Sequence, residues 1–150
     1  MTIAGLRPAS PGDRPAIEAL VAAAYGPYVA EFGQCPGPMQ DDYGALVAAH
    51  RVQVVERAGH ILGLLVLIPQ PDALLLDNIA VAPALHGQGL GRTLLTRAEA
   101  QARALGHTRI RLYTHEKMTR NRRIYAAAGY HETHRVTERG LPRVYMEKPL

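Results

Sequence analysis

The sequence predicts a mixed α/β fold, with about seven strands in a central sheet and about four flanking helices. Three observations favour it: runs rich in Val, Ile and Leu alternate with stretches of helical period, Gly and Pro clusters separate them, and no repeat or linker interrupts the order. At 150 residues with 47% hydrophobic residues, the chain is long enough to bury a core. We therefore expect one domain that spans residues 1–150.

The first half of the chain is expected to contain one strand, two helices and a hairpin. The strand covers residues 3–7. The first helix lies within residues 11–25, with Asp13 as N-cap and Pro15 in the first turn. Its buried face is expected to hold four apolar residues: Ile17, Leu20, Val21 and Ala24.

The segment that follows is punctuated by glycine and proline. Residues 26–39 predict a surface loop in which a helical turn is the alternative to an irregular chain, and residues 41–49 predict a second helix. The hydrophobic period then changes to that of a strand. Residues 51–70 predict a hairpin that turns at Ala58–Gly59.

The second half alternates strands and helices. Residues 73–81 are apolar throughout, which predicts a central strand. Residues 89–105 predict a helix that ends at Gly106, with an apolar stripe of Leu90, Leu94, Ala98 and Leu105. The remaining expected elements are a strand at 108–114 with Ile110 and Leu112 on one side, a helix at 119–129, and strands at 130–136 and 142–150 joined at Arg139–Gly140.

Charge and composition limit the partners. The net charge of +4 favours an anionic partner such as a polyphosphate-bearing small molecule. Basic residues are scattered apart from residues 120–123, and aromatic residues are few, so nucleic acid is not expected. No apolar run approaches the ~20 residues that span a membrane. A lone Cys35 and the absence of a secretory pattern in residues 1–15 favour the cytoplasm.

Three glycines, Gly87, Gly89 and Gly91, stand at alternate positions where the strand at 73–81 gives way to the helix at 89–105. A helix N-terminus leaves backbone N–H groups unpaired and carries partial positive charge, and glycine lets a ligand approach them closely. This pattern predicts a phosphate site. The alternative is a tight connection without a ligand. The spacing fits neither a Walker A loop nor a dinucleotide fingerprint.

The segment VAPALHGQGLGRTLL resembles motif A of the GNAT superfamily of acyl-CoA-dependent N-acyltransferases. RIYAAAGYHET is similar to the closing Tyr-x-x-x-Gly-Phe/Tyr segment of the same family. The resemblance implies a GNAT fold whose central strands, ending near Val81 and starting near Thr108, splay apart. It implies acetyl-CoA as co-substrate, with the pantetheine arm on Ile79, Ala80 and Val81 and the diphosphate held by Gly87, Gln88, Gly89, Leu90, Gly91 and Arg92.

Two positions depart from the family pattern. His86 stands where relatives have Gln or Arg, and near phosphate it is expected to be partly cationic. Met118 stands where many relatives have an Asn that bonds the pantetheine. Asn121, one helical turn later, is the expected substitute, and an exposed residue at a helix start is the alternative.

The resemblance implies direct attack of an amine on the thioester, without a covalent enzyme intermediate. Tyr125 matches the tyrosine that protonates the departing sulfur, although a core tyrosine is the alternative. The N–H of Val81 is expected to polarise the carbonyl. The candidate bases are Asp77 on the central strand and three residues that follow on the next one, Tyr113, His115 and Glu116. Asp77 and Glu116 are the two chosen, and each is otherwise a solvated charge.

The acceptor side is expected in the first helix and the loop after it, where five residues cluster: Tyr25, Tyr28, Glu31, Phe32 and Gln34. No metal is expected, because His131 and His134 should lie on opposite faces of a strand. The sequence thus predicts an acetyl-CoA-dependent N-acetyltransferase of a small-molecule or peptide amine. A non-catalytic CoA-binding sensor or scaffold is the alternative. The strand at 142–150 is a possible edge for a homodimer.

Overall fold

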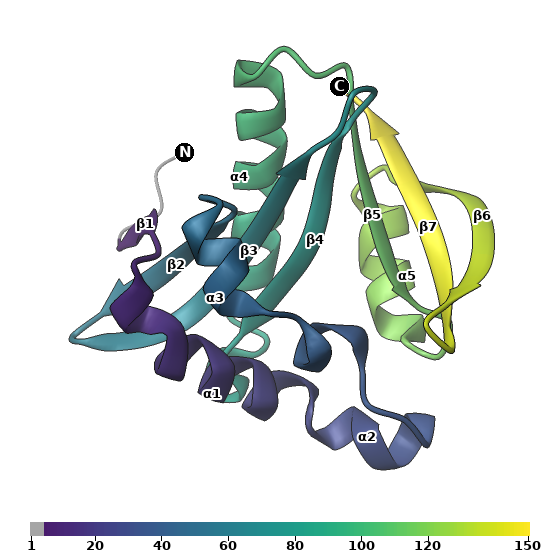
Figure 1. The fold of residues 1–150 in the computed structure, drawn as a ribbon. Helices are drawn as coiled ribbons and strands as arrows, with labels where there is room; N and C mark the ends of the chain where they lie inside the picture. The colour runs from purple at the N-terminus through teal and green to yellow at the C-terminus, as the bar shows by residue number, and fades with distance from the viewer. Residues whose placement is uncertain (1–4) are drawn as a thin grey trace. The chain divides into compact units, whose positions relative to one another are not determined.

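The computed structural model describes residues 5–150, and its strands form a seven-stranded mixed sheet in the order β1-β2-β3-β4-β5-β7-β6 (Figure 1). The strands are β1 Leu6–Pro8, β2 Val52–Arg57, β3 His60–Pro69, β4 Leu74–Val81, β5 Arg109–His115, β6 His131–Glu138 and β7 Leu141–Pro149. The helices are α1 Arg14–Tyr25, α2 Pro27–Phe32, α3 Tyr43–Ala48, α4 Leu90–Ala104 and α5 Thr119–Ala127. Short 3-10 turns cover Pro11–Asp13, Gly37–Gln40 and Pro83–Leu85. The predicted α/β class is confirmed.

The chain divides into two compact units. The first comprises Met1–Leu67 and Asn78–Ala98, and the second comprises Ile68–Asp77 and Glu99–Leu150. β4 and α4 each contribute one end to each unit. No helix among residues 5–150 is long and apolar enough to cross a bilayer. The single domain over residues 1–150 stays a prediction.

In the first unit, the hairpin of β2 and β3 turns where the sequence places it. Ala58 and Gly59 both have positive φ, 51° and 79°, which is the geometry of a tight two-residue turn that matches strand twist. In α1, Ile17, Leu20 and Val21 are buried as expected. Within the predicted loop at 26–39, the helical turn that the sequence allowed is present and extends over residues 27–32 as α2, with Pro27 in its first turn.

Two expectations near the N-terminus need correction. The first strand is Leu6–Pro8, and the part of its prediction at residues 3–4 lies outside the described residues. Asp13 does not cap α1 with its side chain. Its carboxylate instead accepts bonds from the Arg7 guanidinium at 2.8 and 2.9 Å and from the Ser10 N–H at 2.8 Å. Asp13 thus closes the 3-10 turn before the helix.

This ion pair carries a pH-dependent share of stability. The bond from Arg7, aided by Ser10 and opposed by burial, lowers the pKa of Asp13 below its usual range. A lowered folded-state pKa contributes stability above the unfolded value of ~4 and loses it as the pH falls below that value. We expect Asp13→Asn to reduce the free energy of unfolding by about 1 kcal/mol at pH 7.

Urea unfolding of the parent and Asp13→Asn at pH 7, 4 and 3 measures this difference. The difference in the free energy of unfolding between the two proteins should become smaller from pH 7 to pH 4 and pH 3. A difference that grows below pH 4 would contradict the assignment, and Glu18→Gln, which removes an exposed i,i+4 pair with Arg14, is the control with little expected change.

In the second unit, β5 pairs with β7 along its whole length, and β7 pairs with β6. The turn is at Arg139–Gly140, as expected, again with two positive φ angles. Ile110 and Leu112 are buried on one side of β5. The parallel ladder of β4 with β5 holds Leu74–Leu76 opposite Ile110–Leu112, so the two strands are paired at their N-terminal ends. The slot beyond that ladder stays a prediction.

The end of α4 confirms one expectation and corrects another. Gly106 has φ 85°, and the His107 N–H bonds the Ala102 carbonyl at 3.0 Å, which is a Schellman-type stop. Leu105 is 63% exposed, although it was expected on the apolar stripe. α4 ends at Ala104, so Leu105 lies after the helix and its side chain does not continue the apolar face of α4.

Two expectations about the last strands are also wrong. β7 lies between β5 and β6, so the edge strand at this end of the sheet is β6, and β1 is the edge strand at the other end. The ladder of β6 shifts between Glu132 and His134, which inserts Thr133 as an extra residue. His131 and His134 therefore lie opposite Glu147 and Tyr145, on one face and not on two. Even so, no group of three metal-ligating residues occurs in the described part of the chain.

A buried carboxylate links α4 and β7 in the second unit. Glu99, 7% exposed, accepts from the Tyr130 hydroxyl at 3.0 Å and from Lys148 Nζ at 2.9 Å. Lys148→Met should leave this charge without its cation and lower the free energy of unfolding by about 2 kcal/mol. Urea unfolding measures the loss. Adding Glu99→Gln should recover part of it, and a double variant no more stable than Lys148→Met would contradict the pairing.

Candidate functional site

The corner between β4 and α4 lies in the first unit. Gly87 and Gly89 have φ of 81° and 84°, a region that other residues rarely adopt. A Cβ built at either position would meet no atom within 4 Å. The N–H and Oγ1 of Thr93 bond the Gly89 carbonyl at 3.0 and 2.9 Å, so Gly89 is the N-cap of α4. The glycines therefore serve backbone conformation and leave open space beside it.

The first turn of α4 presents unpaired donors. Among the described residues, the N–H groups of Leu90, Gly91 and Arg92 have no hydrogen-bond acceptor, as is usual for the start of a helix. The Gln88 N–H, in contrast, reaches the Leu85 carbonyl at 3.3 Å. The predicted diphosphate site, called the cradle below, therefore depends on the N–H groups of Leu90, Gly91 and Arg92 more than on the N–H of Gln88. Such a group of N–H donors suits an anion.

His86 has a structural contact that the sequence does not reveal. Its Nε2 lies 3.0 Å from the Val81 carbonyl, and since a carbonyl only accepts, Nε2 carries the proton. The ring therefore joins the glycine corner to the end of β4. Its predicted role beside phosphate stays a prediction.

The predicted pantetheine strand is held from its side by Tyr25. The Tyr25 hydroxyl lies 2.6 Å from Asn78 Oδ1 and 3.0 Å from the Ile79 carbonyl. Asn78, 4% exposed, donates to the Tyr43 hydroxyl at 3.2 Å, and that hydroxyl donates to the Pro38 carbonyl at 2.6 Å. Asn78 was missed, although a lone amide within an apolar strand is a signal for such a buried contact.

The other predicted acceptor residues divide by exposure. Phe32 is buried and stacks on Tyr28 with ring centroids 5.2 Å apart, so it packs α2. Glu31 is exposed, and Gln34 is partly buried in the segment that follows α2. The Tyr25 hydroxyl, at the end of α1, already contacts β4. Of the predicted acceptor residues, those on α2 that present polar groups are Tyr28 and Glu31.

Tyr125 lies on α5 in the second unit. Its ring meets the edge of Tyr130 at 6.0 Å, but its hydroxyl has no hydrogen-bond partner among residues 5–150. Burial raises the pKa of Tyr125 to about 12. Because Tyr125 is only partly buried, its hydroxyl needs no protein partner, and its catalytic role stays a prediction.

The two candidates for the pantetheine amide lie together one turn earlier. Asn121 Nδ2 is 3.7 Å from Met118 Sδ. The methionine sulfur is a weak acceptor, so it holds the amide loosely. Asn121 thus keeps a donor and an acceptor for a ligand beside the position that Met118 occupies.

The contacts of the two candidate bases differ. Asp77 is partly buried, and its Oδ1 accepts from the Tyr113 hydroxyl at 2.6 Å. Glu116 instead forms an ion pair with Arg135 at 3.2 Å, where both side chains are about half exposed, 49% and 47%. Each carboxylate thus has a protein partner, and the choice of base stays a prediction.

His115, at the end of β5, is a further titratable group. It is 8% exposed, and its Nδ1 accepts from the Lys117 N–H at 3.0 Å. Burial, with Lys117 nearby, lowers the pKa of His115. It is therefore neutral at pH 7.

Comparisons with known proteins identify the family and agree with the fold. The model of the Acetyltransferase (GNAT) family matches residues 17–130. Over 64 residues, 43% of this chain, the sequence is 41% identical to N-alpha-acetyltransferase 80 of Mus musculus, and it spans 19% of that relative's length. PaiA N-acetyltransferase from Thermoplasma acidophilum, in complex with coenzyme A, has a TM-score of 0.79 at 16% identity, over 97% of this chain and 98% of that chain.

A second solved structure adds the same fold with another ligand. A GNAT family acetyltransferase from Elizabethkingia anophelis with acetyl-CoA bound has a TM-score of 0.65 at 19% identity, covering 77% of this chain and 86% of that chain. At such identities the likeness of the structures shows the fold alone. The fold and the family match, over residues 17–130, agree across most of the chain.

Proposed function

Since the chain belongs to the GNAT family of acetyltransferases, we propose that it transfers an acetyl group from acetyl-CoA to a primary amine. The acceptor in this proposal is a small molecule or a peptide, and the amine attacks the thioester directly. The observation that supports it best is the corner of Gly87, Gly89 and α4, with open space beside three unpaired backbone donors. Relatives of the same fold hold coenzyme A and acetyl-CoA.

Tyr125 is the proposed acid. With a pKa of about 12 it keeps its proton throughout the neutral range. Full transfer of that proton to a thiolate of pKa ~8.5 would cost about 5 kcal/mol, so we expect it to move as the carbon–sulfur bond breaks, not afterwards. A hydroxyl with no competing acceptor among the described residues suits this task.

Asp77 is the proposed base, held by Tyr113. A lysine-like amine of pKa ~10.4 costs about 4.6 kcal/mol to be neutral at pH 7, whereas an α-amine near 8 costs about 1.4 kcal/mol. An α-amine therefore needs less help from a carboxylate. We propose that Asp77 accepts the proton of the attacking amine, directly or through water.

A thiol-release assay tests the proposal. The protein is mixed with acetyl-CoA and a panel of polyamines, amino acids, aminoglycosides and peptides, and free thiol and acetylated product are measured. Amine-dependent release of thiol is the expected result. Binding of acetyl-CoA without transfer to any member would favour the alternative of a non-catalytic CoA-binding module. The cytoplasmic location and the homodimer stay predictions.

A further inference from the structure

Arg143 on β7 is a buried arginine, one of whose guanidinium nitrogens has no hydrogen-bond acceptor in the described part of the chain. It is 8% exposed, and its guanidinium lies over the ring of Tyr113, 4.3 Å from the centroid. Nη1 donates to Glu138 Oε1 at 3.2 Å, whereas the buried Nη2 has no acceptor in the described part of the chain. A buried donor without an acceptor is costly, and a charged one more so, so this nitrogen calls for an acceptor that the described residues do not supply.

The carboxylate beside Arg143 does not satisfy it. Glu138 also accepts from the Tyr145 hydroxyl at 2.5 Å, and its own side chain is 40% exposed. That hydroxyl bond is the shorter of the two, so Glu138 is shared. The guanidinium therefore remains a cation with spare hydrogen-bonding capacity.

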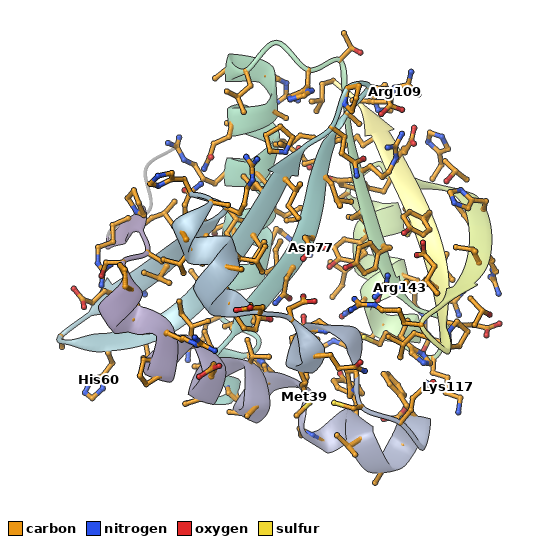
Figure 2. All side chains as sticks on the ribbon, viewed as in Figure 1. Met39, His60, Asp77, Arg109, Lys117 and Arg143 are labelled. Carbon is orange, nitrogen blue, oxygen red and sulfur yellow. The ribbon has the colours of Figure 1, made fainter. Side chains whose placement is uncertain are left out.

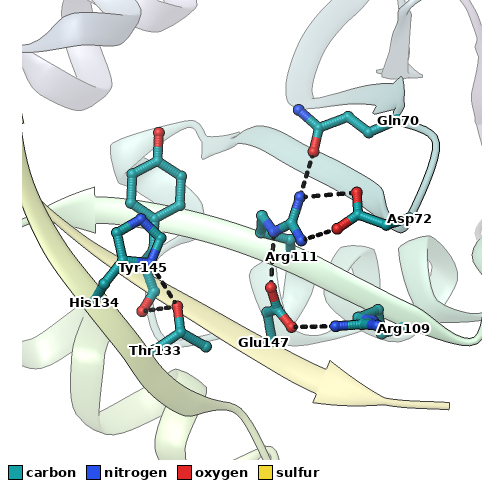
Figure 3. A network of polar contacts seen from close by, with 8 residues as sticks. All are labelled: Gln70, Asp72, Arg109, Arg111, Thr133, His134, Tyr145 and Glu147. Carbon is teal, nitrogen blue, oxygen red and sulfur yellow. Dashed lines mark hydrogen bonds and ion pairs between the residues drawn. The ribbon is translucent and has the colours of Figure 1, made fainter.

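Arg111, on the neighbouring strand β5, shows the contrast. Its Nε donates to Glu147 at 2.8 Å, Nη1 to Gln70 at 2.7 Å, and Nη2 to Asp72 at 2.7 Å (Figure 3). Every nitrogen of this guanidinium is paired. It fixes the segment before β4 to β5, which is a structural role. Arg143 lacks such a set of partners.

The strand register places Arg143 near the proposed base. Across β5 and β7, Tyr113 lies opposite Tyr145 and His115 opposite Arg143, so these side chains share one face. The hydroxyl of Tyr113 donates to Asp77 while its ring lies under the guanidinium. One tyrosine thus contacts both the carboxylate proposed to receive a proton and the guanidinium whose Nη2 has no acceptor. Figure 2 labels Asp77 and Arg143, both in the second unit.

We propose that Nη2 of Arg143 binds a carboxylate of the acceptor, so that the substrate is an amine that also carries a carboxylate group. The proposal rests on the proposed function. Guanidinium and carboxylate match in charge and planar geometry, and such bonds are strong when buried. A doubly charged phosphate fits less well, because Glu138 and Asp77 already place negative charge around this face. Free amino acids and acidic peptides both supply such a group.

Matched acceptor pairs test the proposal. Acetyl transfer is measured for glycine against glycinamide, and for an Asp-Asp-Ala peptide amide against an Asn-Asn-Ala peptide amide. We expect the acid of at least one pair to be preferred at least ten-fold in kcat/KM. A preference in the glycine pair would indicate that the acceptor is a free amino acid, and a preference in the peptide pair that it is an acidic peptide. Equal or better use of the neutral member in both pairs would overturn the proposal.

Variants assign the preference to Arg143. Arg143→Gln should abolish it through a raised KM for the acid, with KM for acetyl-CoA unchanged, and Arg143→Lys should restore part of it. Arg109→Gln, an exposed arginine of β5, is the control that should keep the preference. A preference that survives in Arg143→Gln would also overturn the proposal.

A binding readout separates failure of this inference from failure of the proposed function. The guanidinium NMR signals of the parent protein and Arg143→Gln are titrated with N-acetylaspartate and with its diamide. Signals absent from Arg143→Gln should shift with the acid and not with the diamide. This result would support the carboxylate site even if no amine is acetylated, and no shift with the acid would contradict it.

Discussion

Replacing Gly89 by glutamate is expected to weaken binding of acetyl-CoA at least a hundred-fold. The position has φ 84°, and a Cβ there enters open space beside the unpaired donors of α4. A glutamate would fill that space and place negative charge where we propose that a diphosphate lies. Calorimetric titration with acetyl-CoA measures the loss.

Gly106→Glu is the matched control. Gly106 has nearly the same φ, 85°, and equally open surroundings, but lies at the other end of α4. It should lose similar stability and bind acetyl-CoA normally. Gly89→Lys, which has similar bulk and opposite charge, should bind better than Gly89→Glu. Unchanged binding in Gly89→Glu would refute the cradle, and equal losses in both glutamate variants would assign the effect to folding.

Tyr125→Phe is expected to lower kcat about a hundred-fold and leave acetyl-CoA binding unchanged. The hydroxyl is the proposed proton donor, and general acids contribute roughly that much. Because it has no hydrogen-bond partner among the described residues, its removal should change the free energy of unfolding by less than about 0.5 kcal/mol. Steady-state kinetics and urea unfolding measure the two effects.

Tyr130→Phe gives the opposite result if these roles are right. The Tyr130 hydroxyl donates to the buried Glu99, so its loss should destabilise the fold and spare kcat. With a pKa of about 12, Tyr125 stays protonated to well above pH 10, and deprotonation of this residue should not limit the rate below that. Full activity in Tyr125→Phe would make it a packing residue.

Much of the fold could be predicted because its signals are local. Both hairpin turns and the stop of α4 contain a glycine at positive φ, which the sequence shows, although Ala58 and Arg139 adopt positive φ without such a signal. Asp13 was assigned wrongly because its partner, Arg7, competes with the helix for the same carboxylate. The bulge at Thr133 depends on pairing with β7, which no local pattern encodes.

The site divides in the same way. The glycine corner lies within one short segment, so spacing and composition could reveal it. The contacts of Tyr113 with Asp77 and Arg143 join residues far apart in sequence, and only the register of β5 and β7 brings them together. The spare donor of Arg143 depends on what its neighbours already bind, which requires coordinates.

The irregular outer strand of the sheet has a consequence for association. A long straight strand with free backbone groups invites growth into the sheet of another chain. β6 instead carries the extra residue Thr133 next to Glu132, and its first seven residues are exposed. A kinked, charge-bearing border of this kind resists uncontrolled stacking of copies, and so protects the concentrated protein from aggregating through this border.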